Sequence, residues 1–211
     1  MTSDCHLIVF ARAPVPGQVK TRLIPSMGLS AATVLYEQLV MHGLSIAINA
    51  RLGPVDLWCA PSTSHPFFLQ LTRKFPIALF KQAGGDLGHR MAHAFRKTLK
   101  KTSHALLIGT DCPTLTHDDL REAAEGLRRG IDAVIGPAED GGYVLIGLRR
   151  CVPELFAGIP WGTGSVLHQT RLRLKELGWK WHELSEHWDV DRPEDVERLK
   201  GEGGLKEILK K

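Results

Sequence analysis

Short apolar runs alternate with helical segments along nearly the whole chain, and this alternation limits the fold more than any other feature. The strand-like runs span 6–11, 55–60, 77–80, 105–108, 132–136, 143–148 and 179–184. The segments expected to be helical span 30–50, 66–75, 87–99, 116–129, 164–177 and 193–200. Strands that alternate with helices build a mostly parallel sheet covered on both faces. The sequence therefore predicts a three-layer α/β/α fold with a mostly parallel central sheet.

The composition is typical of a globular protein, with 43% hydrophobic and 24% charged residues among 211. We expect one domain over residues 1–211. The helix at 87–99 is expected to bury the stripe Leu87, Met91, Phe95 and Leu99. A charged tail, 201–211, is expected to be irregular.

The cysteine pattern and the charge exclude several classes of protein. Four widely separated cysteines without a C-x-x-C pair argue against a zinc site or a disulfide framework. No apolar run approaches the roughly 18 residues of a membrane span, and the first residues do not resemble a signal peptide. We expect free thiols and a cytoplasmic protein without a membrane partner. The formal charge of +4 is spread over the chain, which favours small anionic ligands over nucleic acid.

Charged residues follow several strands at the point where each strand ends. A cationic loop, 12–23, follows the first strand, Asp111 follows 105–108, and Glu139 and Asp140 follow 132–136. Ligands of α/β proteins bind beyond the carboxyl ends of the strands. The sequence therefore predicts a site at this edge.

The loop 12–23 carries three cations, Arg12, Lys20 and Arg22, together with two prolines and a glycine. Pro16 fixes the backbone path, and Gly17 lets a ligand approach the main chain. The three cations favour binding of a polyphosphate. The alternative is a surface loop that binds nothing. Neither standard nucleotide motif is present, because Val19 replaces the glycine before Lys20 of a P-loop and no G-x-G-x-x-G follows the first strand.

Four motifs occur in matching order: F-A-R-A-P-x-P-G-x-V-K-T-R-L at the start, then 109–113, 139–143 and 189–195. In these motifs the chain resembles a bacterial group of GT-A-type glycosyltransferases, some of which are named for arsenosugar biosynthesis. More distantly it resembles 2-phospholactate and molybdenum-cofactor guanylyltransferases. The resemblance implies a nucleotide-diphospho-sugar transferase fold, which is Rossmann-like.

The resemblance also implies a metal site. It gives Asp111 the role of binding the Mg²⁺ or Mn²⁺ that bridges a diphosphate, with Asp191 as a second ligand. Glycosyltransferases of this type have Asp-x-Asp at this position, whereas this chain has Asp-Cys-Pro. The second aspartate is absent here, as it is in the nucleotidyltransferases that the chain resembles. Asp111 could instead cap a turn through Thr114, Asp189 could replace Asp191, and Asp191 could be a helix N-cap.

The remaining candidates concern the acceptor and the base. Asp140, or else Glu139, would orient or deprotonate an attacking hydroxyl, with Gly141 and Gly142 beside the acceptor. The alternative is a plain hairpin turn. By resemblance, the region of Gln82 contacts the base. Trp161 and Thr163 are candidates for the acceptor pocket, although Trp161 could equally belong to the core.

Together these residues predict a metal-dependent transferase in which Lys20 and the other cations stabilise the departing diphosphate. In the leading version, a nucleotide-sugar donates a glycosyl group to the hydroxyl of a small acceptor. In the second version, a nucleoside triphosphate donates a nucleotidyl group to a phosphorylated or carboxylated acceptor and pyrophosphate leaves. A non-catalytic nucleotide-binding protein and an RNA-binding protein are further alternatives. The sequence does not give the oligomeric state.

Overall fold

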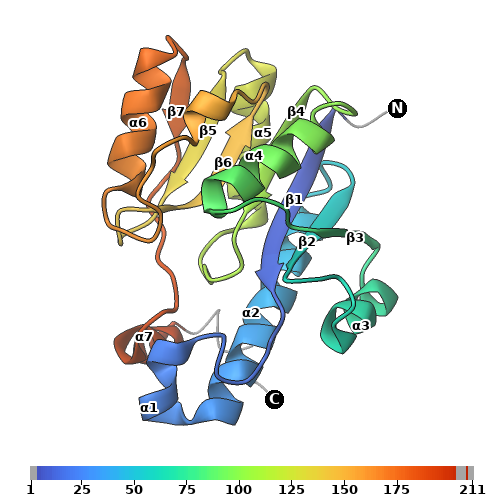
Figure 1. Cartoon of the computed structure of the whole chain (residues 1–211), viewed down its shortest axis with the longest axis vertical. Coiled ribbons are helices and arrows are strands. Elements are labelled where there is room, and N and C mark those ends of the chain that lie inside the picture. Colours follow the sequence, from blue (N-terminus) through green and yellow to red (C-terminus); the bar gives the residue numbers. More distant parts are fainter. Residues whose placement is uncertain (1–3, 203–207, 209–211) are drawn as a thin grey trace.

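The computed structural model describes residues 4–202 and 208, which form a seven-stranded sheet between two layers of helices (Figure 1). The strand order is β3-β2-β1-β4-β6-β5-β7, and only β6 runs antiparallel to its neighbours. The strands are β1 (Cys5–Arg12), β2 (Val55–Ala60), β3 (Ile77–Lys81), β4 (His104–Ile108), β5 (Ala133–Pro137), β6 (Tyr143–Leu148) and β7 (Trp181–Glu183). The predicted three-layer α/β/α fold with a mostly parallel sheet is confirmed.

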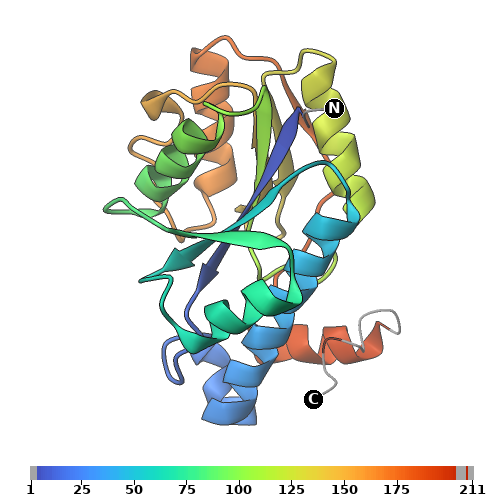
Figure 2. The ribbon, with the colours of Figure 1, turned by 90° about the vertical axis from the view of Figure 1, so that its right-hand side faces the viewer.

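The helices lie on both faces of the sheet, as the alternation predicts. They are α1 (Ile24–Met27), α2 (Leu29–Asn49), α3 (Pro66–Lys74), α4 (Leu87–Thr98), α5 (His117–Arg128), α6 (Val166–Glu176) and α7 (Pro193–Gly201). Helices α2, α3 and α5 cover one face, and α4 and α6 cover the other (Figure 2). Short 3₁₀ turns span Thr21–Leu23 and Pro153–Leu155.

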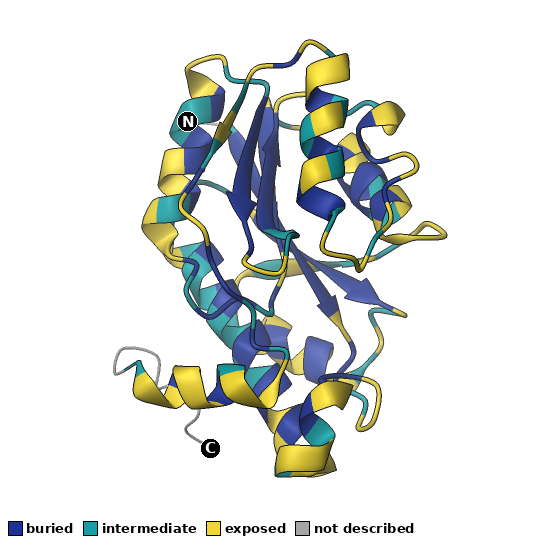
Figure 3. Ribbon diagram, turned by 90° about the vertical axis from the view of Figure 1, so that its left-hand side faces the viewer, coloured by how far each residue is buried: buried dark blue, intermediate teal, exposed yellow. Residues whose placement is uncertain are grey.

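Alternating side chains of β1 explain how one strand serves both layers. Leu7 and Val9 pack with α2, whereas Ile8 and Phe10 pack with α4, because successive residues of a strand point to opposite faces. The central strands are accordingly buried along their length (Figure 3). Burial on both faces accounts for the uninterrupted apolar sequence of β4.

Capping residues set the starts of two helices where the sequence predicts them. The Asp86 carboxylate accepts a hydrogen bond from the His89 N–H (2.8 Å) at the start of α4. Thr116 and Asp119 form a reciprocal capping box at the start of α5. The predicted stripe of α4 is wrong at one position: Leu87 is 42% exposed, because the first turn of α4 projects beyond the carboxyl edge of the sheet.

The segment Thr21–Met27 is helical, whereas the sequence predicts a loop over 12–23 and no helix before residue 30. Apart from the two apolar clusters on the faces of the sheet, this segment forms a smaller one with the start of α2 and with α7. This cluster joins Leu23, Leu35 and Leu39 to Trp188 and Val190. The loop after β1 and the segment before α7 are therefore held together below the sheet (Figure 1). Most of the tail that was expected to be irregular, residues 203–207 and 209–211, lies outside the described residues.

The expectation that no apolar run approaches the length of a membrane span was too strong. Within the described part of the chain, α2 is long and apolar enough, by length and composition alone, to cross a membrane. Half of its most apolar stretch is buried inside the protein, and a core helix passes the same test. The expectation of free thiols is confirmed for Cys59 and Cys112, which are buried, and for Cys151, which is half-buried.

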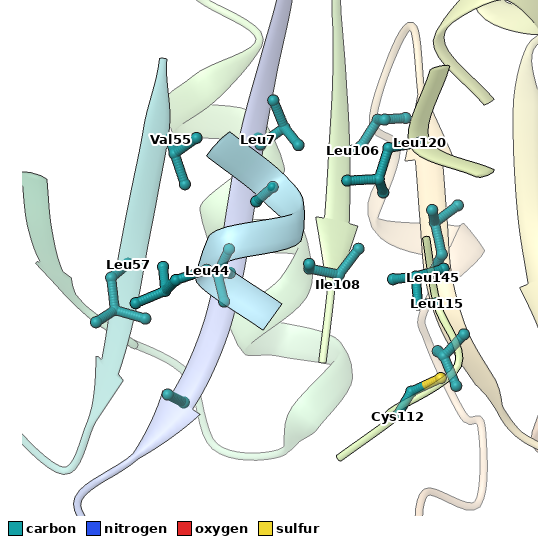
Figure 4. Close-up of a cluster of buried hydrophobic side chains, with 14 of the residues drawn as sticks. Leu7, Leu44, Val55, Leu57, Leu106, Ile108, Cys112, Leu115, Leu120 and Leu145 are labelled. Carbon is teal, nitrogen blue, oxygen red and sulfur yellow. The ribbon is translucent and has the colours of Figure 1, made fainter. Parts of the chain in front are cut away.

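We expect Leu44→Ala to lower the free energy of unfolding by about 2–5 kcal/mol. Leu44 of α2 is fully buried and packs with Leu7, Leu57 and Ile108 (Figure 4), so the truncation leaves a cavity. The control Leu69→Ala removes a side chain that is 49% exposed and should change stability by less than about 0.5 kcal/mol. Urea unfolding followed by circular dichroism measures both. Equal losses in the two variants would contradict this description of the core.

Candidate functional site

A cleft opens at the carboxyl edge of the sheet and consists of two connected hollows. The first hollow has a volume of about 630 Å³ and the second about 430 Å³. Both are lined by Phe10, Arg22, Leu87, Gly109, Asp111, Tyr143, Val144, Asp189 and Asp191. The first hollow extends over the loop after β1, and the second extends toward the β5–β6 turn and the segment before α6. The site is thus where the sequence analysis expects it.

Lys20 is the structural centre of the first hollow. Its side chain is only 4% exposed, and its ammonium forms an ion pair with Asp111. It also donates a hydrogen bond to the Val190 carbonyl (2.6 Å). The Val190 N–H in turn donates to the Asp111 carbonyl (2.9 Å). Three segments that are far apart in the sequence are therefore fixed to one another.

The backbone of Lys20 is left-handed, with φ 47° and ψ 40°. A residue with a Cβ pays roughly 1–3 kcal/mol for such a conformation, and it persists only where the surroundings fix it. Here the buried ammonium and its two partners fix it. This strain marks Lys20 as a positioned group rather than an ordinary loop lysine.

Arg22 and Asp191 form a second ion pair across the mouth of the cleft, where the Arg22 side chain is exposed and that of Asp191 is about half-exposed. Asp191 is not the N-cap of α7, because that position belongs to Arg192. Asp195 accepts hydrogen bonds from the N–H groups of Asp191 (2.9 Å) and Arg192 (2.6 Å) instead. The capping alternative for Asp191 is therefore wrong. Asp111 likewise pairs with Lys20 and does not cap a turn through Thr114.

Asp189 completes a group of carboxylates in the cleft. The pKa of Asp189 is raised from 3.8 to about 7, chiefly by burial and next by the negative charge of Asp111. The charge of Lys20 opposes this rise. Asp189 and Asp191, two residues apart in an extended segment, both line the two hollows. Both candidates for the second metal ligand, Asp191 and its alternative Asp189, therefore lie at the site.

Arg12 lines the first hollow, and its backbone N–H donates to the Tyr36 hydroxyl (2.7 Å). Pro16 and Gly17, also predicted to bind phosphate, do not line the cleft. Gly17 instead makes a turn with φ 82°, which directs residues 18–22 into it. These two residues therefore shape the loop and lie away from the hollow.

Gln82 lines the first hollow with its amide already engaged. The amide nitrogen donates to the carbonyls of Ala11 (3.1 Å) and Trp58 (2.8 Å). An amide has two N–H donors. Only the carbonyl oxygen of Gln82 is left to contact a ligand, so paired recognition of a base edge by this amide is not possible in this conformation.

The turn between β5 and β6 separates two neighbouring carboxylates. Asp140 lines the second hollow and accepts a hydrogen bond from the Gly142 N–H (2.9 Å). Glu139 points to α7, where it pairs with Arg198 (2.9 and 3.1 Å), and this contact holds the pKa of Glu139 below its usual value. Glu139 and Gly141 do not line the cleft, whereas Gly142 does. Glu139 and Gly141 therefore lie outside both hollows of this structure, and their predicted contact with an acceptor stays a prediction.

Trp161 and Thr163 both line the second hollow. The Trp161 ring also packs edge-on against Tyr143, with ring centroids 6.4 Å apart, and lies against Gly88 of α4. Trp161 therefore belongs both to the hollow and to the adjoining core. The Thr163 hydroxyl donates to the Pro160 carbonyl (2.8 Å), which stabilises the turn before α6.

Two lining residues escaped the sequence analysis as individual candidates. Tyr36 of α2 supports Arg12 from below, and Arg90 of α4 adds a fourth cation to the first hollow. Tyr36 lies within an apolar helical stripe, so its pattern indicates core. Arg90 follows the capping Asp86 by four residues, and helix starts after strands point to the carboxyl edge. The position of Arg90 in the first turn of a helix that follows a strand was therefore the sequence signal that could have placed it at the site.

The carboxylates supply only oxygen ligands, which suit Mg²⁺ or Mn²⁺. Among residues 4–202 and 208, no three His, Cys, Asp or Glu side chains are close enough to hold a metal by themselves. Mg²⁺ is usually bound through one or two carboxylates together with phosphate oxygens and water. The donor set of the cleft, with Asp111 and Asp191, therefore fits a metal that arrives with a phosphorylated ligand.

The profile of one protein family matches residues 44–163, which is more than half of the chain. The family is described as "Uncharacterized protein conserved in bacteria (DUF2064)". The chain belongs to this family. The match includes Asp111, Asp140 and Trp161, but it covers neither Lys20 nor Asp191. Comparison with curated protein sequences gives no match.

Solved structures with the same fold include a protein from Desulfovibrio desulfuricans G20 named as a candidate nucleotide-diphospho-sugar transferase. It is 28% identical, with a TM-score of 0.86, and the match covers 97% of this chain and 90% of that one. This chain therefore has the nucleotide-diphospho-sugar transferase fold. The similarity supports the prediction of a transferase, while the arsenosugar group is not identified by any match.

Two more distant structures share the fold at low identity. CMP:2-keto-3-deoxy-manno-octonic acid synthetase complexed with CTP is 13% identical, with a TM-score of 0.61 over 94% of this chain and 98% of that one. Glucosyl-3-phosphoglycerate synthase from Mycobacterium tuberculosis, in complex with Mn²⁺, UDP and glucosyl-3-phosphoglycerate, is 10% identical. Its TM-score is 0.54, over 98% of this chain and 78% of that one.

We expect Gly141→Ala to lower the melting temperature by several degrees. Gly141 has φ 83°, and an added Cβ would lie 2.1 Å from the Gly164 carbonyl oxygen, so the turn between β5 and β6 must move away from the segment before α6. The control Gly85→Ala places a Cβ where no atom lies within 4 Å. Differential scanning calorimetry compares the two. An unchanged melting temperature for Gly141→Ala would contradict this close approach.

Proposed function

We propose that the protein is a transferase that uses an activated nucleotide, with the diphosphate bound in the first hollow. The observation that carries this proposal is the buried contact between Lys20 and Asp111 at the carboxyl edge of the sheet. Arg12, Arg22 and Arg90 line the same hollow and supply further positive charge. Clustered cations around a hollow favour binding of a diphosphate. The fold shared with candidate nucleotide-diphospho-sugar transferases supports the same function.

In this proposal Lys20, Arg12 and Arg22 hold the phosphates and stabilise charge on the departing diphosphate. Asp111 and Asp191 would hold Mg²⁺ or Mn²⁺, which neutralises phosphate charge when it is bound. The Mn²⁺ complex of the Mycobacterium tuberculosis synthase supports a divalent metal. Asp140 lines the second hollow, from which it would orient an acceptor hydroxyl or take its proton.

The preferred donor is a nucleotide-sugar, and the acceptor is a small molecule with a hydroxyl group. Nucleotidyl transfer from a nucleoside triphosphate is the second candidate, and the fold shared with the CTP-bound synthetase supports it. We also propose that residues 1–211 are a single domain and that the protein is cytoplasmic, because its buried free thiols suit a reducing compartment.

A thermal-shift screen of nucleotides and nucleotide-sugars, with and without Mn²⁺, tests the proposed function. Ligands that bind the folded state raise the melting temperature. We expect a nucleotide-dependent shift that is larger with Mn²⁺ and is lost in Asp111→Ala. Release of a nucleoside diphosphate from the best sugar donor would establish glycosyl transfer, and release of pyrophosphate would establish nucleotidyl transfer. Binding that survives both chelation and Asp111→Ala, without turnover, would instead indicate a nucleotide-binding protein.

We expect Lys20→Met to weaken nucleotide binding by about ten- to a hundredfold. A hydrogen bond to a charged group contributes roughly 1.5–3 kcal/mol, and tenfold in affinity corresponds to about 1.4 kcal/mol. Asp111 is about half-exposed, so water can solvate it after the change. Lys175→Met on α6 is the control, because this residue lies outside both hollows. Isothermal titration calorimetry measures both. Unchanged affinity in a folded Lys20→Met protein would argue against a phosphate at Lys20.

A further inference from the structure

The two hollows of the cleft differ in charge. Four cations line the first hollow: Arg12, Lys20, Arg22 and Arg90. Three aspartates line it as well. The second hollow has one cation, Arg22, against the four aspartates Asp111, Asp140, Asp189 and Asp191. The cleft is therefore polarised along its length, from a cationic end to an acidic end.

Cations pair with two of the aspartates of the second hollow, and among the described residues Asp140 has no such partner. Arg22 is already paired with Asp191, and Lys20 is buried against Asp111 on the side of the first hollow. Asp140 accepts its hydrogen bond from a backbone N–H and not from a cation. An anionic group placed beside Asp140 would face repulsion from this carboxylate.

The other wall of the second hollow is apolar. It consists of Phe10, Leu87, Met91, Leu107, Val144 and Val166, together with the rings of Tyr143 and Trp161. Leu87 is 42% exposed, although the rest of α4 buries its apolar side chains. A large aliphatic side chain that stays uncovered within a concave site is available to contact the apolar face of a ligand.

We propose that the second hollow binds an acceptor alcohol that has an apolar face and carries no phosphate or carboxylate group. This inference rests on the proposed function, since it specifies the acceptor of the same cleft. The phosphate groups of the donor bind at the cationic end, and the acceptor hydroxyl enters beside Asp140 at the acidic end. Such an acceptor favours glycosyl transfer over nucleotidyl transfer to a phosphorylated or carboxylated acceptor.

Two aryl glycosides that differ in one group test the charge preference. 4-Nitrophenyl β-D-glucoside and 4-nitrophenyl β-D-glucuronide share the ring and the apolar aryl group, but the second has a carboxylate in place of a hydroxymethyl group. In ligand-observed NMR titrations of the full chain, we expect the glucoside to bind at least about fivefold more tightly, the effect of one like-charge contact in water. Equal affinity, tighter binding of the glucuronide, or binding of neither compound would overturn the proposal.

Variants in each wall localise the binding to the second hollow. Leu87→Ala should weaken glucoside binding severalfold, whereas Leu172→Ala, which changes a leucine of α6 that is 40% exposed and outside the cleft, should leave it unchanged. Asp140→Asn should narrow the gap between the two glycosides. The matched control Glu139→Gln, whose carboxylate points to Arg198, should preserve the gap. Identical behaviour within either pair of variants would place the ligand elsewhere and overturn the proposal.

Failure of this inference is distinguishable from failure of the proposed function. The thermal-shift screen reports nucleotide binding at the first hollow and needs no acceptor. A nucleotide shift that depends on Asp111, combined with a preference for the glucuronide, would overturn only the acceptor class. Loss of the nucleotide shift in every condition would overturn the transferase itself.

Discussion

The site depends on one buried contact, the ammonium of Lys20 between the Asp111 carboxylate and the Val190 carbonyl. A buried charge is costly unless it is paired and hydrogen-bonded, so these partners must stay where they are once Lys20 is enclosed. The contact fixes the loop after β1 to the end of β4 and to the extended segment before α7. The apolar cluster of Leu23, Trp188 and Val190 reinforces the same junction from below. The same contact thus fixes the side chains of the first hollow and holds these three segments of the chain together.

The charge distribution of the cleft has a different origin in each half. The cations of the first hollow come from the last residue of β1, from the loop after it and from the start of α4. The extra carboxylate of the second hollow, Asp140, comes from the hairpin that β6 makes by running antiparallel. One reversal in strand direction therefore brings an acidic turn to the edge where the parallel strands end. The chemical asymmetry of the cleft is a direct result of the sheet topology.

The sequence predicts the sheet and the location of the site well, because both depend on local patterns. Apolar runs locate the strands, and Asp86 and Thr116 mark helix starts through short-range hydrogen bonds. The direction of single side chains depends on tertiary contacts, which the sequence predicts less well. Glu139 turns away to Arg198, and Leu87 stays uncovered. Asp191 pairs with Arg22, 169 residues away, so of its two predicted roles only helix capping is wrong. Gln82 lies in the cleft as expected, but its donors serve the main chain, which no local pattern reveals.

The contact between Lys20 and Val190 spans 170 positions of the chain. During synthesis, the loop after β1 leaves the ribosome well before its partners in the segment 189–191. The strands and helices between them can collapse first, since most of their contacts are closer in sequence. The cleft therefore cannot be completed until the segment 189–191 has been synthesised, which happens after the last strand of the sheet, β7, has left the ribosome.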